Sequence, residues 1–367
     1  MRVHVVDPSA YTRPYDHGLC SALARNGLDV ELITSAFGYG ELPSPDGYQV
    51  RQLFYRHALG APGSRLRTAT KLAEHAPDML RYRGAARAAD VVHFQWLPVQ
   101  SIDVRLLPRT PTVLTAHDLL PREPRAGQVR AQRQLYEAVD AVIAHSDYGR
   151  RQLVEAVGVD PAKVHVVHHG AFEHLATAGH PLREELQQVE APVVLFFGLL
   201  RPYKGIEVLL EAWRGIEGAE LWIVGRPRMA LEPLRARAPA GVRFVPRYVS
   251  ESELPAYFRR ADLVVLPYTR TERFDFSGVL ATALAFGKAV VASEIGGFSE
   301  VGALRLVPPD DPGALREAIA RLLADAAERE RLASAARAAA AGPYSWDEAA
   351  RRTIEVYRGI GHNPRRQ

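Results

Sequence analysis

Short apolar runs alternate with helix-like stretches along most of the chain, and this alternation restricts the fold more than any other feature of the sequence. Strands of a parallel sheet are buried on both faces and read as continuous apolar runs, while the connecting helices cover the sheet. The sequence therefore predicts an α/β protein. The expected strands lie at Val3–Val6, Val30–Thr34, Val91–His93, Val113–Thr115, Ala141–Ala144, Val164–His169, Val193–Phe197, Leu221–Val224, Val242–Val245, Leu263–Leu266 and Ala289–Ala292.

The chain of 367 residues is longer than a single hydrophobic core usually supports, so two domains are expected. A polar stretch at residues 171–189 interrupts the alternation and is the best candidate for a connection between them. We predict a first domain over residues 1–172 and a second domain over residues 190–342. A last helix over residues 343–360 is expected to pack back on the first domain.

Composition excludes several classes of function. The single cysteine, Cys20, rules out an intramolecular disulfide and a cysteine-based metal cluster, and its neighbours place it in the core of a helix. The net charge of +4 permits anionic ligands, but the arginines are scattered, so no nucleic-acid partner is expected. No apolar run reaches membrane-spanning length, and the amino terminus lacks the pattern of a signal peptide. The expected location is the cytoplasm.

A two-part pattern in the second half of the chain indicates a site for a diphosphate. The apolar strand ending at Phe197 is followed by Gly198, which allows a sharp turn, and then by Arg201 and Lys204 near the start of a helix. Side chains in that position project from the carboxyl end of the strand, where open α/β sheets bind ligands. Two fixed cations there suit a pyrophosphate group.

The second part of the pattern is Ser277-Gly278 at the start of an alanine-rich helix that runs to Phe286. The free backbone N–H groups and the positive end of such a helix bind anions. Gly278 allows a phosphate oxygen to approach the backbone closely. The Ser277 hydroxyl either donates to that oxygen or only caps the helix, and the cationic turn upstream favours the phosphate interpretation.

The chain resembles the retaining GT-B glycosyltransferases of family 4, also called group 1 glycosyltransferases. The resemblance covers nearly the whole chain and is carried by the Lys204-Gly205 turn, the strand Ala261–Pro267, the Ala285–Lys288 turn and the segment Gly296–Glu300. It implies a GT-B architecture, in which two Rossmann-like domains face each other across a cleft. It also implies transfer of a sugar from a nucleotide-diphosphate sugar with retention of anomeric configuration. Because fixed cations and a helix dipole can replace a metal ion at the diphosphate, we expect no cofactor and no dependence on a metal ion.

The resemblance assigns donor-binding residues, with one departure from the family pattern. Family members hold the nucleotide ribose with the second of two glutamates, whereas this chain has Phe274 and Thr282 at those positions. Glu272 and Asp275 are the nearest acidic residues, although neither is in register. The predicted donor-binding residues are Gly170, Arg201, Lys204, Glu272, Asp275, Ser277, Gly278, Val279 and Thr282.

Three residues form the predicted catalytic set: His117, Arg201 and Lys204. His117 follows the strand ending at Thr115, and the resemblance implies that it positions or polarises the donor sugar. An imidazole suits that role because it can donate or accept a hydrogen bond near neutral pH. The alternative is a histidine that is hydrogen-bonded within its own loop. The two cations would stabilise the charge that develops on the leaving diphosphate.

Asp16, His17 and Gly18 are the acceptor-side candidates, because they lie between the first strand and the first helix. The family often has a glycine-rich loop there, close to the donor phosphates and the acceptor. An equal alternative for Asp16 is the N-cap of the helix, since aspartate is among the best residues at that position.

The acceptor itself stays open, because a fold does not specify its substrate. A glycan, a lipid-linked molecule and a small molecule all remain candidates. The basic segment at residues 65–87 would suit a membrane surface or an anionic lipid-linked acceptor, and a solvated arginine face is the simpler alternative. Two other functions are left open, namely a nucleotide-sugar epimerase on the same fold and a non-catalytic nucleotide-sugar binding protein that Phe274 and Thr282 would explain.

Overall fold

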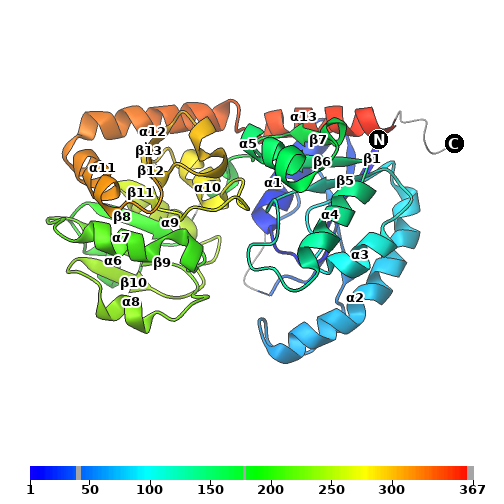
Figure 1. Cartoon of the computed structure of the whole chain (residues 1–367), viewed down its shortest axis with the longest axis horizontal. Helices are drawn as coiled ribbons and strands as arrows, with labels where there is room; N and C mark the ends of the chain where they lie inside the picture. The colour runs from blue at the N-terminus through cyan, green and yellow to red at the C-terminus, as the bar shows by residue number, and fades with distance from the viewer. Residues whose placement is uncertain (39–42, 177–178, 362–367) are drawn as a thin grey trace. The chain divides into compact units, whose positions relative to one another are not determined.

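The computed structural model describes residues 1–38, 43–176 and 179–361, which form two compact units (Figure 1). The first unit contains residues 1–170, the short segment 273–275 and the chain from Trp346 onward. The second contains residues 171–272 and 276–345. The units differ from the predicted contiguous ranges because a piece of three residues from the second half of the chain belongs to the first unit. Of the predicted connection, residues 177–178 lie outside the described residues.

The first unit is built on a parallel sheet of seven strands in the order β3-β2-β1-β4-β5-β6-β7. Strand β1 lies between β2 and β4, so that Val5 is in register with Leu32 on one side and His93 on the other. The core strands are buried and mostly apolar, as is typical of the strands of a parallel sheet. The strands are β1 (Arg2–Asp7), β2 (Asp29–Ser35), β3 (Gln49–Phe54), β4 (Val91–Phe94), β5 (Thr112–Thr115), β6 (Ala141–Ala144) and β7 (Val164–Val166).

Helices connect these strands and cover the sheet. The predicted last helix, α13, packs beside α1 within this unit (Figure 1). Cys20 is buried in α1, as expected. Among the described residues, no helix is both long and apolar enough to cross a membrane. The helical segments are α1 (Arg13–Arg25), α2 (Arg65–Ala85), η1 (Ala86–Ala88), α3 (Gln100–Leu106), α4 (Gln128–Ala138), α5 (Asp147–Arg151), η2 (Gln152–Val157), η3 (Pro161–Lys163) and α13 (Trp346–Gly361).

The second unit repeats the plan with a parallel sheet of six strands in the order β10-β9-β8-β11-β12-β13. Its strands are β8 (Val193–Phe197), β9 (Glu220–Val224), β10 (Val242–Val245), β11 (Leu263–Leu266), β12 (Val290–Ser293) and β13 (Leu304–Val307). Its helical segments are η4 (Glu173–Ala176), α6 (Glu184–Gln187), η5 (Pro202–Lys204), α7 (Ile206–Trp213), α8 (Glu232–Ala236), α9 (Leu254–Arg260), α10 (Gly278–Ala285), η6 (Gly296–Glu300), α11 (Pro312–Ala324) and α12 (Ala326–Ala341).

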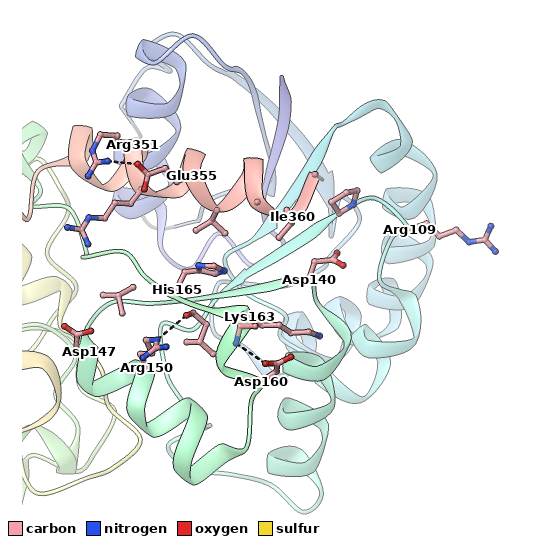
Figure 2. A pocket seen from close by; sticks show the side chains of 18 residues that line it. Arg109, Asp140, Asp147, Arg150, Asp160, Lys163, His165, Arg351, Glu355 and Ile360 are labelled. Carbon is pink, nitrogen blue, oxygen red and sulfur yellow. Dashed lines mark hydrogen bonds and ion pairs between the residues drawn. The ribbon is translucent and has the colours of Figure 1, made fainter. Parts of the chain in front are cut away.

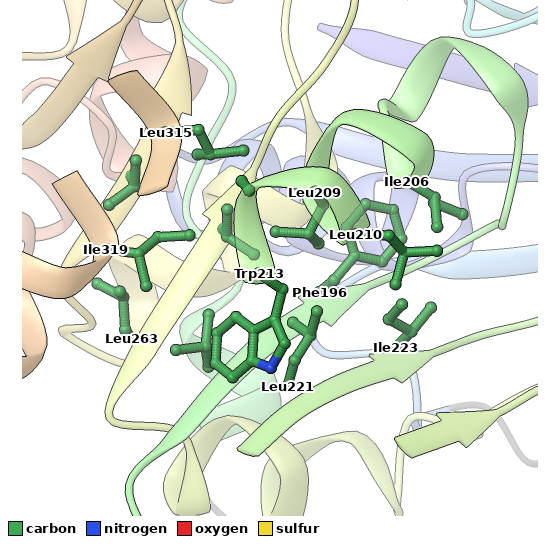
Figure 3. Close-up of a cluster of buried hydrophobic side chains, with 14 of the residues drawn as sticks. Phe196, Ile206, Leu209, Leu210, Trp213, Leu221, Ile223, Leu263, Leu315 and Ile319 are labelled. Carbon is green, nitrogen blue, oxygen red and sulfur yellow. The ribbon is translucent and has the colours of Figure 1, made fainter. Parts of the chain in front are cut away.

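The core of the second unit centres on Trp213 at the end of α7. Figure 3 shows its indole among side chains from β8, β9 and α11, including Phe196, Leu221 and Ile319, and all four side chains are inaccessible to solvent. Truncating a buried residue of this size usually costs about 3–5 kcal/mol. This packing fixes α7, and with it the turn that precedes the helix and carries Lys204.

Candidate active site

The carboxyl end of β8 brings together the two parts of the predicted diphosphate site. Gly198 follows the strand with a φ of 110°, which residues other than glycine rarely adopt. A Cβ placed on Gly198 would lie 2.8 Å from Nζ of Lys204 and 3.1 Å from Cγ2 of Val279. The strand end, the cationic turn and the first turn of α10 therefore meet at one point of the second unit.

A tight turn holds the Lys204 ammonium at that point. Gly205 follows with a φ of 70°, and a Cβ there would overlap the carbonyl oxygen of Pro267. Lys204 is only 6% exposed, and its Nζ lies 5.1 Å from the centre of the Tyr268 ring. The ammonium therefore lies against an aromatic face, which favours a cation, beside Gly198.

Sequence reasoning missed Tyr268, which links the two parts of the site. Its hydroxyl lies 3.0 Å from Oγ of Ser277, and that Oγ accepts a hydrogen bond from the backbone N–H of Val279 at 3.2 Å. Tyr268 thus lies under the Lys204 ammonium and fixes the cap of α10. The only signal was its position two residues after the buried strand β11.

Several predicted donor-binding groups are engaged within the protein. Ser277 is the N-cap of α10, as the capping interpretation predicts. The Thr282 hydroxyl donates to the carbonyl oxygen of Gly278 at 2.8 Å, and Thr282 is 4% exposed. Glu272 is exposed and lies in the second unit. The contacts of these residues with a nucleotide sugar stay predictions.

Arg201 directly precedes η5, and its Nε is buried with no hydrogen-bond partner among the described residues. A buried donor without a partner costs free energy, so most such groups in proteins are satisfied by a protein group, water or a ligand. A phosphate oxygen would satisfy this one. Among the predicted donor-binding residues, Arg201 therefore gives the most direct indication of a bound ligand, because its buried Nε lacks a hydrogen-bond acceptor among the described residues.

Asp275 and its neighbour Phe274 lie in the first unit, as Gly170 does, whereas the other predicted donor-binding residues lie in the second unit. The buried Asp275 carboxylate accepts a hydrogen bond from the backbone N–H of His145 at 2.6 Å and another from the hydroxyl of Ser146. Phe274 is buried and forms an isolated antiparallel bridge with Asp118. Both residues anchor the segment 273–275, and a donor contact by Asp275 would require it to exchange these bonds.

His117 lies at the carboxyl end of β5 in the first unit, with hydrogen-bond partners from neighbouring strands. Its Nε2 is 3.0 Å from Oε1 of Gln95, its Nδ1 is 3.4 Å from Nε2 of His145, and its ring stacks on Trp96 with 5.1 Å between centroids. His117 also lines a cavity of about 190 Å³. The hydrogen-bond partners of His117 therefore lie outside its own loop, because Gln95 follows β4 and His145 follows β6, and the ring borders a cavity.

Four histidines gather near Tyr15 in this region. Tyr15 contacts the rings of His117, His145 and His169 at centroid distances of 4.7, 5.4 and 4.9 Å. Burial lowers the pKa of His93 to about 3, of His145 to about 4 and of His169 to about 3, and it holds that of His117 well below its usual value. The cluster is therefore neutral near pH 7. Within the described part of the chain, no group of three or more His, Cys, Asp or Glu residues is placed to hold a metal ion.

The acceptor-side candidates lie around the first turns of α1. The N-cap of α1 is Thr12, so Asp16 is not the cap and the capping alternative is wrong. Asp16 is fully buried, and burial together with the nearby Asp7 raises its pKa well above the usual value. Nδ1 of His17 lies 2.9 Å from the hydroxyl of Tyr48.

Gly18 and Gly170, predicted to approach the acceptor and the nucleotide, both lie against the indole of Trp346. A Cβ on either glycine would overlap that ring. Trp346 begins α13 and is 7% exposed. At both positions, therefore, the absence of a side chain accommodates a tryptophan of the same unit. Ligand contacts of the two glycines stay predictions.

A cavity of about 1270 Å³ in the first unit lies between β7 and α13 (Figure 2). Its cations are bonded to groups of the protein. Arg351 pairs with Glu355, and Nζ of Lys163 donates to the carbonyl oxygen of Val139 at 2.9 Å. Nε of Arg150 donates to Val164. Because these cations are already bonded to protein groups, this cavity is a weaker candidate for an anion-binding site than the strand end at Gly198.

Two parallel α/β units, one with a cationic turn and a helix N-terminus meeting at a strand end, define the GT-B class of enzymes. The family model "Glycosyltransferase Family 4" matches residues 17–171, and the model "Glycosyl transferases group 1" matches residues 191–325. The chain belongs to this family and is a glycosyltransferase. The binding-protein and epimerase alternatives are therefore set aside.

Relatives with established names agree with this assignment. The chain is 31% identical over 380 residues to a protein of Xylanimonas cellulosilytica named D-inositol 3-phosphate glycosyltransferase, covering 92% of this chain and 89% of that protein. A protein of the same name from Mycobacterium tuberculosis is 30% identical over 390 residues, covering 94% and 78% of the two chains.

Solved structures share the fold. Sucrose-phosphate synthase from Thermosynechococcus elongatus superposes with a TM-score of 0.76 at 21% identity, covering 98% of this chain and 99% of that chain. Anabaena HepE in complex with UDP and glucose superposes with a TM-score of 0.75 at 19% identity, covering 98% of this chain and 100% of that chain. The predicted GT-B architecture is therefore confirmed.

Proposed function

We propose that this glycosyltransferase moves a sugar from a nucleotide-diphosphate sugar to a hydroxyl group of a small polyhydroxylated acceptor, with retention of anomeric configuration and without a metal ion. The observation that carries the proposal is the meeting of Lys204 and the N-terminus of α10 at Gly198, with the unsatisfied Nε of Arg201 in the turn that follows. Two cations and a helix N-terminus form a site for a diphosphate.

In the proposed reaction, the bond between the anomeric carbon and the β-phosphate oxygen breaks, and a bond to the acceptor oxygen forms on the same face of the sugar. Negative charge then accumulates on the diphosphate, where Arg201, Lys204 and the amides of α10 would stabilise it. The departing phosphate oxygen takes the acceptor proton. No side chain is needed as a nucleophile in this scheme.

His117 would orient the sugar as a neutral imidazole, because its lowered pKa keeps it uncharged near pH 7. Its Nε2 faces Gln95, whose own amide nitrogen is buried with no hydrogen-bond partner among the described residues. If the Gln95 side chain turned so that its Oε1 moved away from His117, Nε2 of His117 could form a hydrogen bond with a sugar hydroxyl instead.

Two comparisons guide the choice of substrates. Relatives that cover nearly all of this chain are named D-inositol 3-phosphate glycosyltransferases, and a GT-B structure of similar fold contains UDP and glucose. We therefore propose a phosphorylated or free cyclitol as the first acceptor class to test. Glycans and lipid-linked molecules are the alternatives.

The test is a coupled assay for release of the nucleoside diphosphate. Purified protein is mixed with UDP-, GDP- and dTDP-sugars, with and without D-inositol 3-phosphate, in buffer containing EDTA. We expect release to depend on one donor and to rise with acceptor, and NMR of the product to show the donor's anomeric configuration. Inverted configuration, or activity only with a divalent ion, would contradict the corresponding part of the proposal.

A further inference from the structure

Two histidines of the first unit, His117 and His145, face each other through ring nitrogens. Nδ1 of His117 lies 3.4 Å from Nε2 of His145, and His145 is 1% exposed. A neutral imidazole carries its proton on one nitrogen only, so a hydrogen bond between the rings requires one of these nitrogens to donate and the other to accept. The positions of the protons therefore follow from the remaining partners of each ring.

The other nitrogen of His145 fixes the tautomer of this residue. Its Nδ1 lies 2.9 Å from the carbonyl oxygen of Val167, which can only accept a hydrogen bond. Burial lowers the pKa of His145 to about 4, so the ring is neutral near pH 7. Nδ1 of His145 therefore carries the proton, and Nε2 carries a lone pair that faces His117.

His145 is held in this position by its backbone as well as by its ring. Its N–H donates to the Asp275 carboxylate at 2.6 Å, and Nδ1 of His168 lies 3.1 Å from its carbonyl oxygen. The backbone N–H of Val167 donates to the carbonyl oxygen of Ala144 at 2.9 Å, which fixes the acceptor of the His145 ring. The lone pair of His145 is therefore a fixed feature of the first unit.

This fixed lone pair determines the tautomer of His117. If Nδ1 of His117 carries the proton, it donates to His145, whereas in the opposite tautomer two lone pairs face each other at 3.4 Å. Burial holds the pKa of His117 well below its usual value, so the doubly protonated ring is not the main form near pH 7. The Nδ1–H tautomer is therefore favoured, and Nε2 of His117 is an acceptor.

The side chain of Gln95 agrees with this tautomer once its amide turns. Its Oε1 lies 3.0 Å from Nε2 of His117, so that two acceptors would face each other, whereas its buried amide nitrogen has no hydrogen-bond partner among the described residues. A half-turn of the amide brings that nitrogen to Nε2 of His117 and satisfies both groups. One row of hydrogen bonds then runs from Gln95 through the two rings to Val167.

Aromatic side chains hold the plane of the His117 ring beside a cavity. Trp96 stacks on the ring with 5.1 Å between centroids, and Tyr15 contacts it edge-on with 4.7 Å between centroids. Both His117 and Gln95 line the cavity of about 190 Å³. A sugar hydroxyl in that cavity could replace the Gln95 amide and donate to Nε2 of His117.

We propose that His145 is a positioning residue for sugar transfer, because it holds His117 in the Nδ1–H tautomer and so makes Nε2 of His117 accept a hydrogen bond from a hydroxyl group of the donor sugar. The proposal rests on the proposed function, since it assigns a role within the same reaction. The sugar gains positive charge in the transition state. An accepting nitrogen near that charge stabilises it, whereas a donating N–H would oppose it.

The test measures the tautomer of His117 directly. The full chain is prepared with isotopically labelled histidine, and NMR spectra that correlate the carbon-bound ring protons with the ring nitrogens distinguish a protonated from an unprotonated nitrogen. The signals of His117 are assigned with the variant His117→Gln. The measurement needs no ligand, so it does not depend on sugar transfer.

Three variants separate positioning from structure. His145→Phe keeps a ring against Tyr15 and removes the acceptor for Nδ1 of His117. His145→Gln retains an amide oxygen that can accept in place of Nε2. His165→Phe is the matched control, because His165 lies on β7 and lines the cavity between β7 and α13. Thermal unfolding of each variant checks that it folds.

We expect His117 of the wild-type chain to show the Nδ1–H tautomer, and His145→Phe to shift it toward Nε2–H. With a donor sugar and an acceptor, His145→Phe should lower kcat about tenfold, as loss of one hydrogen bond in the transition state implies. The KM for the donor should stay within about twofold, because the hydrogen bond matters most in the transition state. His145→Gln should restore most of kcat, and His165→Phe should leave it unchanged.

A wild-type His117 with its proton on Nε2, or a tautomer that His145→Phe does not change, would overturn the proposal. A folded His145→Phe chain with the kcat of the wild type would overturn it as well. Absence of sugar transfer by the wild-type chain, with the tautomer as expected, would instead contradict the proposed function.

Discussion

In the second unit, backbone segments approach each other around a cation, whereas in the first unit the candidate groups are side chains bonded to one another. A Cβ on Gly225 would overlap the carbonyl oxygen of Gly198, and one on Gly205 would overlap that of Pro267. His117, by contrast, lies among aromatic rings and amides of its own unit. Local backbone geometry therefore shapes the donor site, whereas segments distant in sequence surround the histidines and keep them neutral.

The first prediction tests the close backbone approach in the second unit with the variant Gly205→Ala. A left-handed backbone costs a residue with a side chain about 1–2 kcal/mol, and overpacking adds about 1–3 kcal/mol. We expect the free energy of unfolding of the second unit to fall by about 2–5 kcal/mol. Urea unfolding followed by tryptophan fluorescence measures it.

Gly215→Ala is the control, because Gly215 has a φ of 84° but no heavy atom within 4 Å of its Cβ position. It should cost only the backbone term, about 1–2 kcal/mol. Equal losses in the two variants would show that close approach to Pro267 contributes nothing.

The second prediction concerns pH and the histidine cluster. The pKa of His93 is about 3 in the folded chain against an ordinary value of 6.5, because burial disfavours its charged form. Below pH 6.5 the unfolded chain binds a proton that the folded chain does not. The stability is therefore fully present above pH 6.5 and falls as pH drops toward the folded pKa values, by up to about 1.4 kcal/mol per pH unit for each histidine.

Unfolding of the wild-type chain and of His93→Gln at pH 7, 6 and 5 measures this linkage. Glutamine keeps polar contacts near Thr115 and Tyr357 and removes the titrating group. We expect the free energy of unfolding of the variant to fall less steeply with decreasing pH, by up to the contribution of one histidine, about 1.4 kcal/mol per pH unit. Parallel curves would contradict the idea that His93 is held neutral by burial.

The sequence predicted the central strands of both sheets, and it missed one edge strand in each. β3 has mostly exposed residues, β13 has only one buried residue, and each lies at an edge of its sheet. An edge strand therefore lacks the continuous apolar run by which a central parallel strand is recognised. Apolar runs in the sequence therefore predict the central strands of a parallel sheet more readily than its edge strands.

The residues of the candidate site also fall into two groups, those that the sequence predicts and those that it does not. Arg201, Lys204 and Ser277-Gly278 could be predicted because local motifs place them at a strand end and a helix start. Tyr268 and the contacts of His117 with Gln95 and His145 could not, because their partners come from other segments of the chain. Asp275 was grouped with its sequence neighbours, whereas its hydrogen bonds place it in the first unit.

A third prediction follows from that placement of Asp275. Asp275→Asn removes a buried carboxylate that accepts from His145 and Ser146, so we expect the free energy of unfolding to fall by about 1.5–3 kcal/mol. Nucleotide affinity should stay unchanged. Glu272→Gln, at an exposed position nearby in sequence, should change stability by less than about 0.5 kcal/mol. Weaker nucleotide binding in Asp275→Asn with unchanged stability would favour the donor role that the sequence predicts.

The smallest expected effect belongs to Thr282→Val, which keeps the shape of the side chain and removes its hydroxyl. Because that hydroxyl is bonded to Gly278 and buried, we expect a stability loss of about 0.5–1.5 kcal/mol and nearly unchanged nucleotide affinity. Calorimetric titration with nucleotide gives the affinity. A tenfold loss of affinity would instead place Thr282 on the ribose, as the sequence alignment with the family implies.

The most direct test of the central claim is calorimetric titration of UDP, GDP, dTDP and CDP into the wild-type chain and Lys204→Ala. Arg237→Ala is the control, because Arg237 is a largely exposed cation of the same unit. We expect one nucleotide to bind the wild-type chain and the control equally well and to bind Lys204→Ala at least about tenfold more weakly, with unchanged folding. A wild-type chain that binds none of the four, or a Lys204→Ala chain that binds as tightly as the wild type, would contradict the diphosphate site.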